Sequence, residues 1–356
     1  MLTKARLSTL KYFLIILLFT ICVSSVSAQG GGYAVIKQYS DMGYTSMIYD
    51  ATNGLPTSDA NCILGSRKGN VWIGGYSGII RYDGNIFERL PTTNGLTSGR
   101  TFYEDSKDRI WVGTNDNGVV LIDGEDIRQY TYKDGLPSSS IRNFAEDKEG
   151  NIFIATTSGL AFIKENGLLY HLSDAVLNTE RILKLDSDSS GTIYGHTTNG
   201  IVFSVKKRNV SEIYTSAELD MPKITTLLAD PVNEGKVYLC CEGGKIYYGD
   251  FGKKKSELQE IDISPITSVQ WISYDCFRVW LCSRTQIAYL DQDNKVNVVS
   301  NLPMNGSIEM FTSDYQGNIW VCSSTQGVMK IVANNFVNVT EEAKLPKKNC
   351  KYDLSA

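Results

Sequence analysis

The sequence predicts an all-β fold, a seven-bladed β-propeller of four-stranded antiparallel blades. Three observations predict it. A stretch of two strand-like runs separated by polar turns recurs along the chain, its copies number seven, and one aromatic position in each copy recurs every 39 to 44 residues. A period of about 40 residues with roughly four strands per unit is typical of propellers. The recurring aromatics are Trp72, Trp111, Phe153, Tyr194, Tyr238, Trp280 and Trp320.

The clearest copy is the second one. Asp105–Asp108 is a tight polar turn, because an Asp side chain can accept hydrogen bonds from backbone N–H groups two residues on. Arg109–Thr114 is rich in β-branched and aromatic residues, which favours a strand. A second turn, Asn115–Gly118, leads into the strand Val119–Asp123. We expect Thr101–Glu104 to line the central channel, and the aromatic to pack between neighbouring blades.

An Asp precedes the aromatic by five to eight residues in six copies, including Asp105, Asp147 and Asp314. Only the first copy lacks it and has Ser66 instead. Paired catalytic carboxylates or Ca²⁺ ligands are one interpretation. The fixed place of these Asp residues before a turn favours the other, a structural turn cap.

The termini predict further segments. Residues 1–28 have three positive charges, a short apolar run and small residues before Gln29, as a secretory signal peptide does. The alternative is an uncleaved membrane anchor, for which the apolar run is short. A Gly-rich lead-in at 29–43 is followed by the propeller, 44–340, and by a tail at 341–356. The tail is expected to be the truncated start of a second propeller, which would make the chain a fragment.

Ring closure has two candidates. The last blade, around Trp320, lacks a clear outer strand, and either 47–52 or 336–340 can supply it. The N-terminal segment would join the two chain ends and remove an exposed edge. We therefore expect 47–52 to close the ring.

The sequence contains no motif for catalysis. Cys240, Cys282 and Cys322 each follow a blade aromatic by two residues. A metal or redox cluster is one interpretation, but equivalent strands of separate blades favour three free thiols in the core. The histidines, His171 and His196, form no recognisable catalytic set. We expect no enzyme, cofactor or metal, and the net charge of −4 gives no basic footprint for nucleic acid.

The sequence favours a binding site over a catalytic one. The loops that enter the inner strands, and those that join the second and third strands, surround one mouth of the channel. Their residues differ from blade to blade, as a site for an asymmetric ligand would; the alternative is that unconstrained surface loops vary freely. The candidates are Asn61, Arg100, Arg142, Arg181, Lys223, Tyr76, Asn115, Asp116, His196, Arg284 and Gln326.

Arg100 and Arg142 occupy equivalent places, five residues before the blade Asp. Two neighbouring guanidinium groups repel, so an anionic ligand such as an acidic sugar would stabilise them through bidentate hydrogen bonds. The alternative is that each Arg pairs with a nearby acid, such as Asp59 or Asp116. The corresponding positions in other blades hold Asn61, Thr225, Gln270 and Glu309.

The third copy carries a familiar motif. It reads Gly135-Leu136-Pro137, then Asp147, Gly150-Asn151, Phe153 in a Trp position, and Ser158-Gly159-Leu160. This resembles the repeat of the two-component regulator propeller family. The likeness is strong in copies one to three and seven, and weak from about 177 to 297, where only the spacing and the aromatic persist.

The resemblance implies the extracytoplasmic sensor region of a membrane histidine kinase or diguanylate cyclase. Such a protein is exported to the periplasm or the cell surface and membrane-tethered when intact, here only through missing C-terminal segments or an uncleaved leader. It implies a small-molecule or glycan ligand and a homodimeric intact receptor. The competing functions are a secreted propeller lyase or hydrolase and a protein-interaction scaffold.

Overall fold

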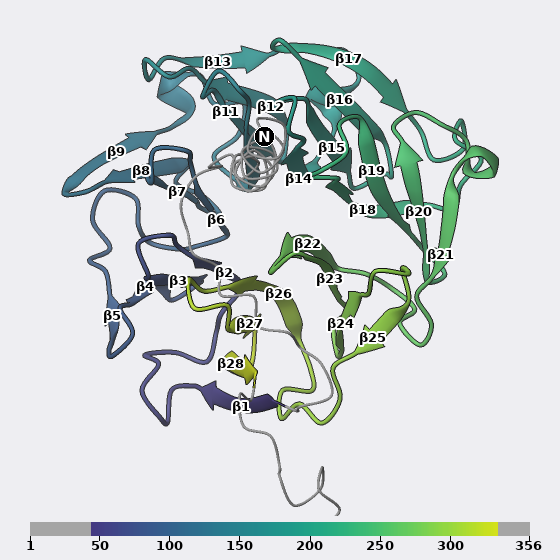
Figure 1. The fold of residues 1–356 in the computed structure, drawn as a ribbon. Coiled ribbons are helices and arrows are strands. Elements are labelled where there is room, and N and C mark those ends of the chain that lie inside the picture. The colour runs from purple at the N-terminus through teal and green to yellow at the C-terminus, as the bar shows by residue number, and fades with distance from the viewer. Residues whose placement is uncertain (1–43, 334–356) are drawn as a thin grey trace, which may run out of the picture. The chain divides into compact units, whose positions relative to one another are not determined.

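The computed structural model describes residues 44–333, which form seven four-stranded antiparallel sheets arranged as blades around a central channel (Figure 1). The predicted seven-bladed propeller is confirmed. The inner strands of successive blades contact one another around the ring, and the last contacts the first. The signal peptide, the lead-in, the 336–340 segment and the tail lie outside the described residues.

Each blade runs from the channel outwards in chain order. The first three blades comprise β2 (Cys62–Gly65), β3 (Val71–Gly75), β4 (Gly78–Tyr82), β5 (Phe87–Arg89); β6 (Thr101–Glu104), β7 (Ile110–Gly113), β8 (Val119–Asp123), β9 (Asp126–Tyr130); and β10 (Ile141–Glu146), β11 (Ile152–Thr156), β12 (Gly159–Ile163), β13 (Leu169–Leu172).

The next three blades comprise β14 (Ile182–Ser187), β15 (Ile193–Thr197), β16 (Val202–Lys206), β17 (Asn209–Tyr214); β18 (Ile224–Ala229), β19 (Lys236–Cys241), β20 (Lys245–Asp250), β21 (Gln259–Asp262); and β22 (Trp271–Asp275), β23 (Arg278–Cys282), β24 (Ile287–Leu290), β25 (Val296–Val298). Short 3₁₀ turns lie at Tyr132–Asp134, Leu177–Thr179 and Lys255–Glu257.

The seventh blade joins the two ends of the described chain. It comprises β26 (Ile308–Ser313), β27 (Ile319–Ser323), β28 (Gly327–Ala333) and, as its outer strand, β1 (Tyr44–Tyr49). Strand β1 pairs with β28 in antiparallel register from Tyr44 opposite Ala333 to Tyr49 opposite Val328. The N-terminal segment therefore supplies this strand, although it begins and ends three residues earlier than 47–52. Asp50 ends it, because its carboxylate accepts a hydrogen bond from Thr52 N at 2.8 Å and turns the chain.

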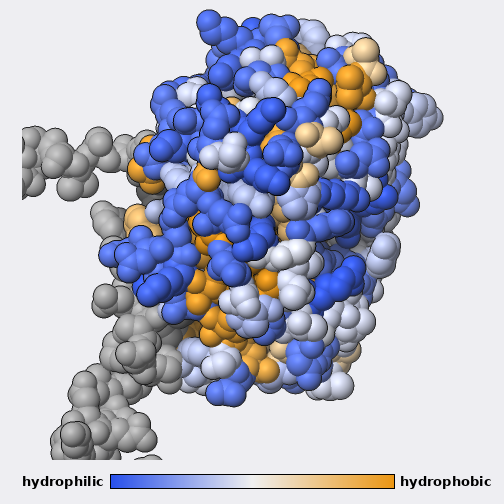
Figure 2. Space-filling view, turned by 90° about the vertical axis from the view of Figure 1, so that its right-hand side faces the viewer, coloured by the Kyte–Doolittle hydropathy of each residue, from blue (hydrophilic) through white to orange (hydrophobic). Residues whose placement is uncertain are grey.

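The hydrophobic core lies between the blades. All seven recurring aromatics are buried, and each packs against the next blade: Trp111, for example, clusters with Ile141, Ile152 and Ile154. The equivalent cluster of Trp320 contains Ile73 of the first blade. Figure 2 shows one side of the ring, where hydrophilic residues prevail and hydrophobic ones gather in separate strips. Each blade is therefore stabilised by its neighbours rather than alone.

The recurring Asp does more than cap its turn. Asp105 accepts hydrogen bonds from Lys107 N at 2.9 Å and Arg109 N at 3.0 Å, as a turn cap would. It also accepts one from the indole nitrogen of Trp111 at 2.8 Å. In the first blade Ser66 stands in its place, and the indole nitrogen of Trp72 is buried without a partner among the described residues.

The three cysteines behave as core residues. Cys240, Cys282 and Cys322 are buried free thiols on equivalent strands of separate blades, as predicted. Burial raises the pKa of the Cys282 thiol to about 12, so it stays protonated at neutral pH. Between residues 44 and 333 no cluster of His, Cys, Asp or Glu is arranged to hold a metal ion.

Candidate functional site

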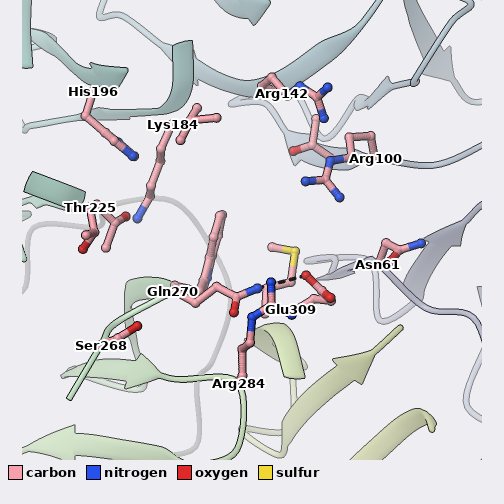
Figure 3. A pocket seen from close by; sticks show the side chains of 15 residues that line it. Asn61, Arg100, Arg142, Lys184, His196, Thr225, Ser268, Gln270, Arg284 and Glu309 are labelled. Atoms are coloured by element: carbon pink, nitrogen blue, oxygen red, sulfur yellow. Dashed lines mark hydrogen bonds between the residues drawn. The ribbon is translucent and has the colours of Figure 1, made fainter. Parts of the chain in front are cut away.

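A cavity of about 390 Å³ lies in the central channel, at the end where the inner strands begin. Every blade contributes to its wall, and Figure 3 shows its side chains converging from the surrounding strands. The lining residues are Asn61, Arg100, Thr101, Arg142, Leu183, Lys184, His196, Thr225, Thr226, Ser268, Gln270, Trp271, Arg284, Glu309 and Met310.

One position at the start of each inner strand contributes a side chain to this wall in all seven blades. In three blades the backbone N–H at that position donates to the neighbouring strand, as from Arg100 N to Gly113 O at 2.8 Å. In the other four, the strand register shifts around this position, as a β-bulge does, for example at Arg142. The following residue, such as Lys184 or Thr226, also reaches the cavity. The blades thus offer pairs of consecutive side chains.

The wall carries four basic side chains and one acidic one, Glu309. No described carboxylate lies within ion-pair distance of Arg100, Arg142 or Arg284. Burial, together with the charges of Arg181 and Arg100, lowers the pKa of Arg142 to about 10, and its Nε has no hydrogen-bond partner within the described chain. The guanidinium groups are therefore uncompensated.

The two acids that could have paired with these arginines are engaged elsewhere. Asp59 accepts hydrogen bonds from Asn61 Nδ2 at 2.7 Å and from Tyr76 N at 2.6 Å. Asp116 accepts from Asn117 Nδ2 at 3.1 Å. The alternative interpretation, in which Arg100 and Arg142 each pair with a nearby acid such as Asp59 or Asp116, is therefore not seen in the structure.

The fourth basic side chain, Lys184, lies on another part of the wall. Its side chain is almost fully buried on β14, donates a hydrogen bond to Ile272 O, and places Nζ 4.7 Å from the centroid of the Trp271 ring. Burial lowers the pKa of this amine, a shift that the charge of Asp186 opposes.

His196 lies directly opposite Lys184 on the neighbouring strand β15. It is 2% exposed, and neither ring nitrogen makes a hydrogen bond of normal geometry. Burial, followed by the charge of Lys184, lowers its pKa to about 3, and a weak contact with the Thr225 backbone offsets only part of this. The imidazole is therefore neutral at pH 7, with one donor and one acceptor unused.

The remaining part of the wall is already hydrogen-bonded. Glu309 accepts from Gln270 Nε2 at 2.9 Å, drawn as a dashed line in Figure 3, and from Ser324 Oγ at 2.9 Å. Both carboxylate oxygens of the one acid are thus in use. Among the described residues, no ion pair joins this acidic side chain to an arginine of the second or third blade.

The structure sorts the predicted site residues into two groups. Five line the cavity: Asn61, Arg100, Arg142, His196 and Arg284. Six are not among the residues that line it: Arg181, Lys223, Tyr76, Asn115, Asp116 and Gln326. Arg181 and Lys223 precede the wall positions of their strands by two residues. The others lie in loops farther from the channel, where Tyr76 is 72% exposed and Gln326 accepts hydrogen bonds from the Asn305 and Gly306 backbone.

The sequence contains a signal for some of the missed residues. Counting five residues back from the blade Asp reaches Leu183, Thr225, Gln270 and Glu309, and all of them line the cavity. Counting four residues back reaches the following residues, and in five blades they line the cavity: Thr101, Lys184, Thr226, Trp271 and Met310. In the first and third blades the same count reaches Cys62 and Asn143, which do not line it, so the repeat spacing does not encode which blades contribute a second side chain.

Two segments of the chain, 97–116 and 135–158, match the family model of the two component regulator propeller. The chain contains two-component regulator propeller repeats. The matched segments cover the parts of the second and third blades that carry the polar turns and the aromatic, as the resemblance of the sequence predicted. No curated protein sequence matches the chain significantly.

Solved structures share the fold at low identity. A streptogramin B lyase is 16% identical, with a TM-score of 0.68, over 82% of this chain and 98% of that one. The extracellular domain of the putative hybrid two component system BT3049 from B. thetaiotaomicron is 14% identical, with a TM-score of 0.66, over 82% of this chain but only 42% of that one. A catalytically inactive virginiamycin B lyase from Staphylococcus aureus, solved with quinupristin, is 14% identical, with a TM-score of 0.65, over 82% and 99%.

The described part of the chain has no helix of the length and apolar character that would span a membrane. The channel cavity is lined by side chains from all seven blades of a propeller built almost wholly of strands. Its chemistry is that of buried hydrogen-bond donors with few acceptors.

Proposed function

We propose that this propeller is the extracytoplasmic ligand-sensing region of a two-component-type receptor, and that its channel binds an anionic small molecule. The repeats and the likeness to the extracellular domain of a two-component protein support the receptor class. The observation that carries the binding proposal is the pair of uncompensated guanidinium groups, Arg100 and Arg142, in the channel cavity.

Two adjacent cations in a partly desolvated cavity repel each other, and the pKa of Arg142 is lowered by burial and further by the charges of Arg181 and Arg100. A carboxylate or another oxyanion between them would replace this repulsion by charge-assisted, bidentate hydrogen bonds. The low local dielectric strengthens such bonds relative to those in water. The fold therefore bears a cost in the empty channel that an anionic ligand removes.

A thermal-shift screen of small acids tests this proposal. We expect at least one acid to raise the melting temperature of the wild type, and Arg100→Ala and Arg142→Ala to weaken that shift. Lys223→Ala is the matched control, because Lys223 is a cation that directly precedes the inner strand β18 of another blade and does not line the cavity. If both arginine variants bind a confirmed ligand as the wild type does, the proposed site is wrong.

A lyase function is the second candidate, because His196 faces the cavity without a partner and the S. aureus lyase is inactive when one histidine is replaced by alanine. General base catalysis works best when the pKa lies near the working pH, whereas that of His196 is about 3. Binding is therefore favoured over catalysis. Turnover of quinupristin by the wild type, abolished in His196→Ala, would reverse this order.

A further inference from the structure

We propose that the channel ligand is a dicarboxylate, or a similar acid with two separated anionic groups, which bridges two parts of the cavity wall. One acidic group would bind at Arg100 and Arg142. The other would bind at a second subsite formed by Lys184, His196 and Trp271. This inference rests on the proposed function, since it concerns the same cavity.

The second subsite is a group of buried donors that lack acceptors. The Lys184 ammonium has three N–H bonds and one acceptor, Ile272 O. The indole nitrogen of Trp271 is buried and, within residues 44–333, has no partner. The His196 imidazole is 2% exposed and has no hydrogen-bond partner of normal geometry, only the weak contact with the Thr225 backbone. Side chains from β14, β15 and β22 therefore bring N–H groups with few acceptors into the cavity wall.

The donors decide which chemical group fits. A buried donor without an acceptor is costly, so the missing group must accept several hydrogen bonds. A carboxylate only accepts and offers about four lone-pair sites, whereas an ammonium only donates and a hydroxyl donates one bond of its own. Asp186 acts on Lys184 from a longer distance, and no described carboxylate lies within ion-pair distance of it, so a ligand carboxylate would form its first close ion pair.

The two subsites face the cavity from different blades. Arg100 and Arg142 come from the second and third blades, and Figure 3 shows Lys184 and His196 on a separate part of the wall. Each part of the wall is therefore assigned one carboxylate of the ligand. A cavity of about 390 Å³ falls within the usual range for small-molecule sites, so one elongated ligand can fill it.

The charge balance leads to the same conclusion. Four basic side chains line the cavity against one acid, Glu309, whose oxygens are already bonded to Gln270 and Ser324. A monoanion would neutralise one subsite and leave the other buried and unpaired. A dianion compensates both.

Isothermal titration with a chain-length series tests the inference. The ligands are α,ω-dicarboxylates from succinate to azelate and the monocarboxylates of matching length, at low ionic strength. We expect the best dicarboxylate to bind about tenfold tighter than its matched monocarboxylate, the gain from one further charge-assisted contact. Lys184→Met should remove that advantage and leave monocarboxylate affinity unchanged. The control, Lys223→Met, should keep both affinities.

The outcomes separate this inference from the function on which it rests. If monocarboxylates bind as tightly as dicarboxylates, and Lys184→Met changes neither affinity, the second subsite is wrong while the anion-binding channel stands. If no acid binds the wild type, both fail. Should Lys184→Met not fold, as judged by its melting curve, His196→Phe supplies the same test, because it removes a donor of the same subsite and should reduce only the dicarboxylate affinity.

Discussion

The two ends of the inner strands differ in how far their residues are repeated from blade to blade. At the turn end, the same Asp, turn and aromatic recur with few changes, and Asp105 satisfies both backbone and indole donors. At the channel end, equivalent positions hold residues as different as Arg142, Thr225 and Glu309. Repetition therefore marks what holds neighbouring blades together, and variation marks where the ring can recognise a ligand.

The two ends also differ in hydrogen bonding, although Trp72, Glu104 and Arg278 each keep a buried atom unpaired at the turn end. The turn ends of the second and seventh blades have a partner for each aromatic N–H, at 2.8 Å to Asp105 and 2.9 Å to Asp314. At the channel end, Arg142, His196 and Trp271 each keep a buried nitrogen unpaired. Substitutions at the turn end should therefore cost stability, whereas substitutions at the channel end should mainly change binding.

The largest expected effect lies at the turn end. Trp111→Ala removes a ring that is 1% exposed and packs against the third blade, so we expect it to lower the free energy of unfolding by about 3–5 kcal/mol. Tyr76→Ala removes a ring of similar kind at the channel end that is 72% exposed, and should change little. Urea denaturation of both variants measures the contrast. Equal stability of the two would show that Trp111 is outside the inter-blade core.

The next effect concerns the carboxylate beneath that ring. Asp105 is fully buried, and its Oδ2 lies 2.7 Å from Arg109 Nε as well as accepting from the indole. Asp105→Ala leaves these donors unpaired, and we expect it to lower the free energy of unfolding by about 2–4 kcal/mol. Asp116→Ala, in an exposed loop at the other end, is the matched control. A loss no larger than that of the control would mean that the Asp only shapes its turn.

The same contrast explains how far the sequence predicts the molecule. The blade number, the strand order and the buried aromatics follow from a repeat, because one packing solution is used seven times. The Trp72 position shows the limit of that reasoning, since its spacing predicts burial but not its unpaired nitrogen. Lys184 and Trp271 were missed because only the position five residues before the blade Asp was considered, and the repeat does not encode in which blades the next residue also reaches the cavity.

A third prediction tests the channel end through pH. Since the pKa of His196 falls from 6.5 to about 3 on folding, the unfolded state binds a proton that the folded state does not in this range. The free energy of unfolding therefore decreases as the pH falls below about 6.5. Because the decrease is about 1.36 kcal/mol per pH unit, it amounts to about 2 kcal/mol at pH 5. Lys184 is the charged group that faces His196 and adds to this shift.

His196→Gln should remove that part of the pH dependence. The measurement is the change in free energy of unfolding between pH 7 and pH 5, which should be about 2 kcal/mol smaller in the variant than in the wild type. His171→Gln is the control, because His171 is exposed and its loss should leave the pH dependence as it is. An unchanged slope in His196→Gln would show that the imidazole is solvated in the folded protein.

The smallest expected effect is an increase in the free energy of unfolding. It would come from giving the first blade the turn residue of the seventh. In the seventh blade Asp314 accepts hydrogen bonds from Asn318 N at 2.9 Å, from Asn318 Nδ2 and from Trp320 Nε1. The first blade has Asn70 and Trp72 at the same spacing, but Ser66 in place of the Asp. Its hydroxyl donates to Asn70 O at 3.1 Å and does not reach the indole.

Ser66→Asp should therefore complete the missing set of hydrogen bonds. We expect the free energy of unfolding to increase by about 1 kcal/mol, which is the net contribution of one hydrogen bond made by a donor that was unpaired before. Arg67 and Lys68 follow directly and offset the added charge. Ser66→Ala is the control and should be neutral or slightly destabilising. A Ser66→Asp variant that is less stable than Ser66→Ala would mean that the first blade differs in its backbone as well as in this side chain, so that the turn is not interchangeable between blades.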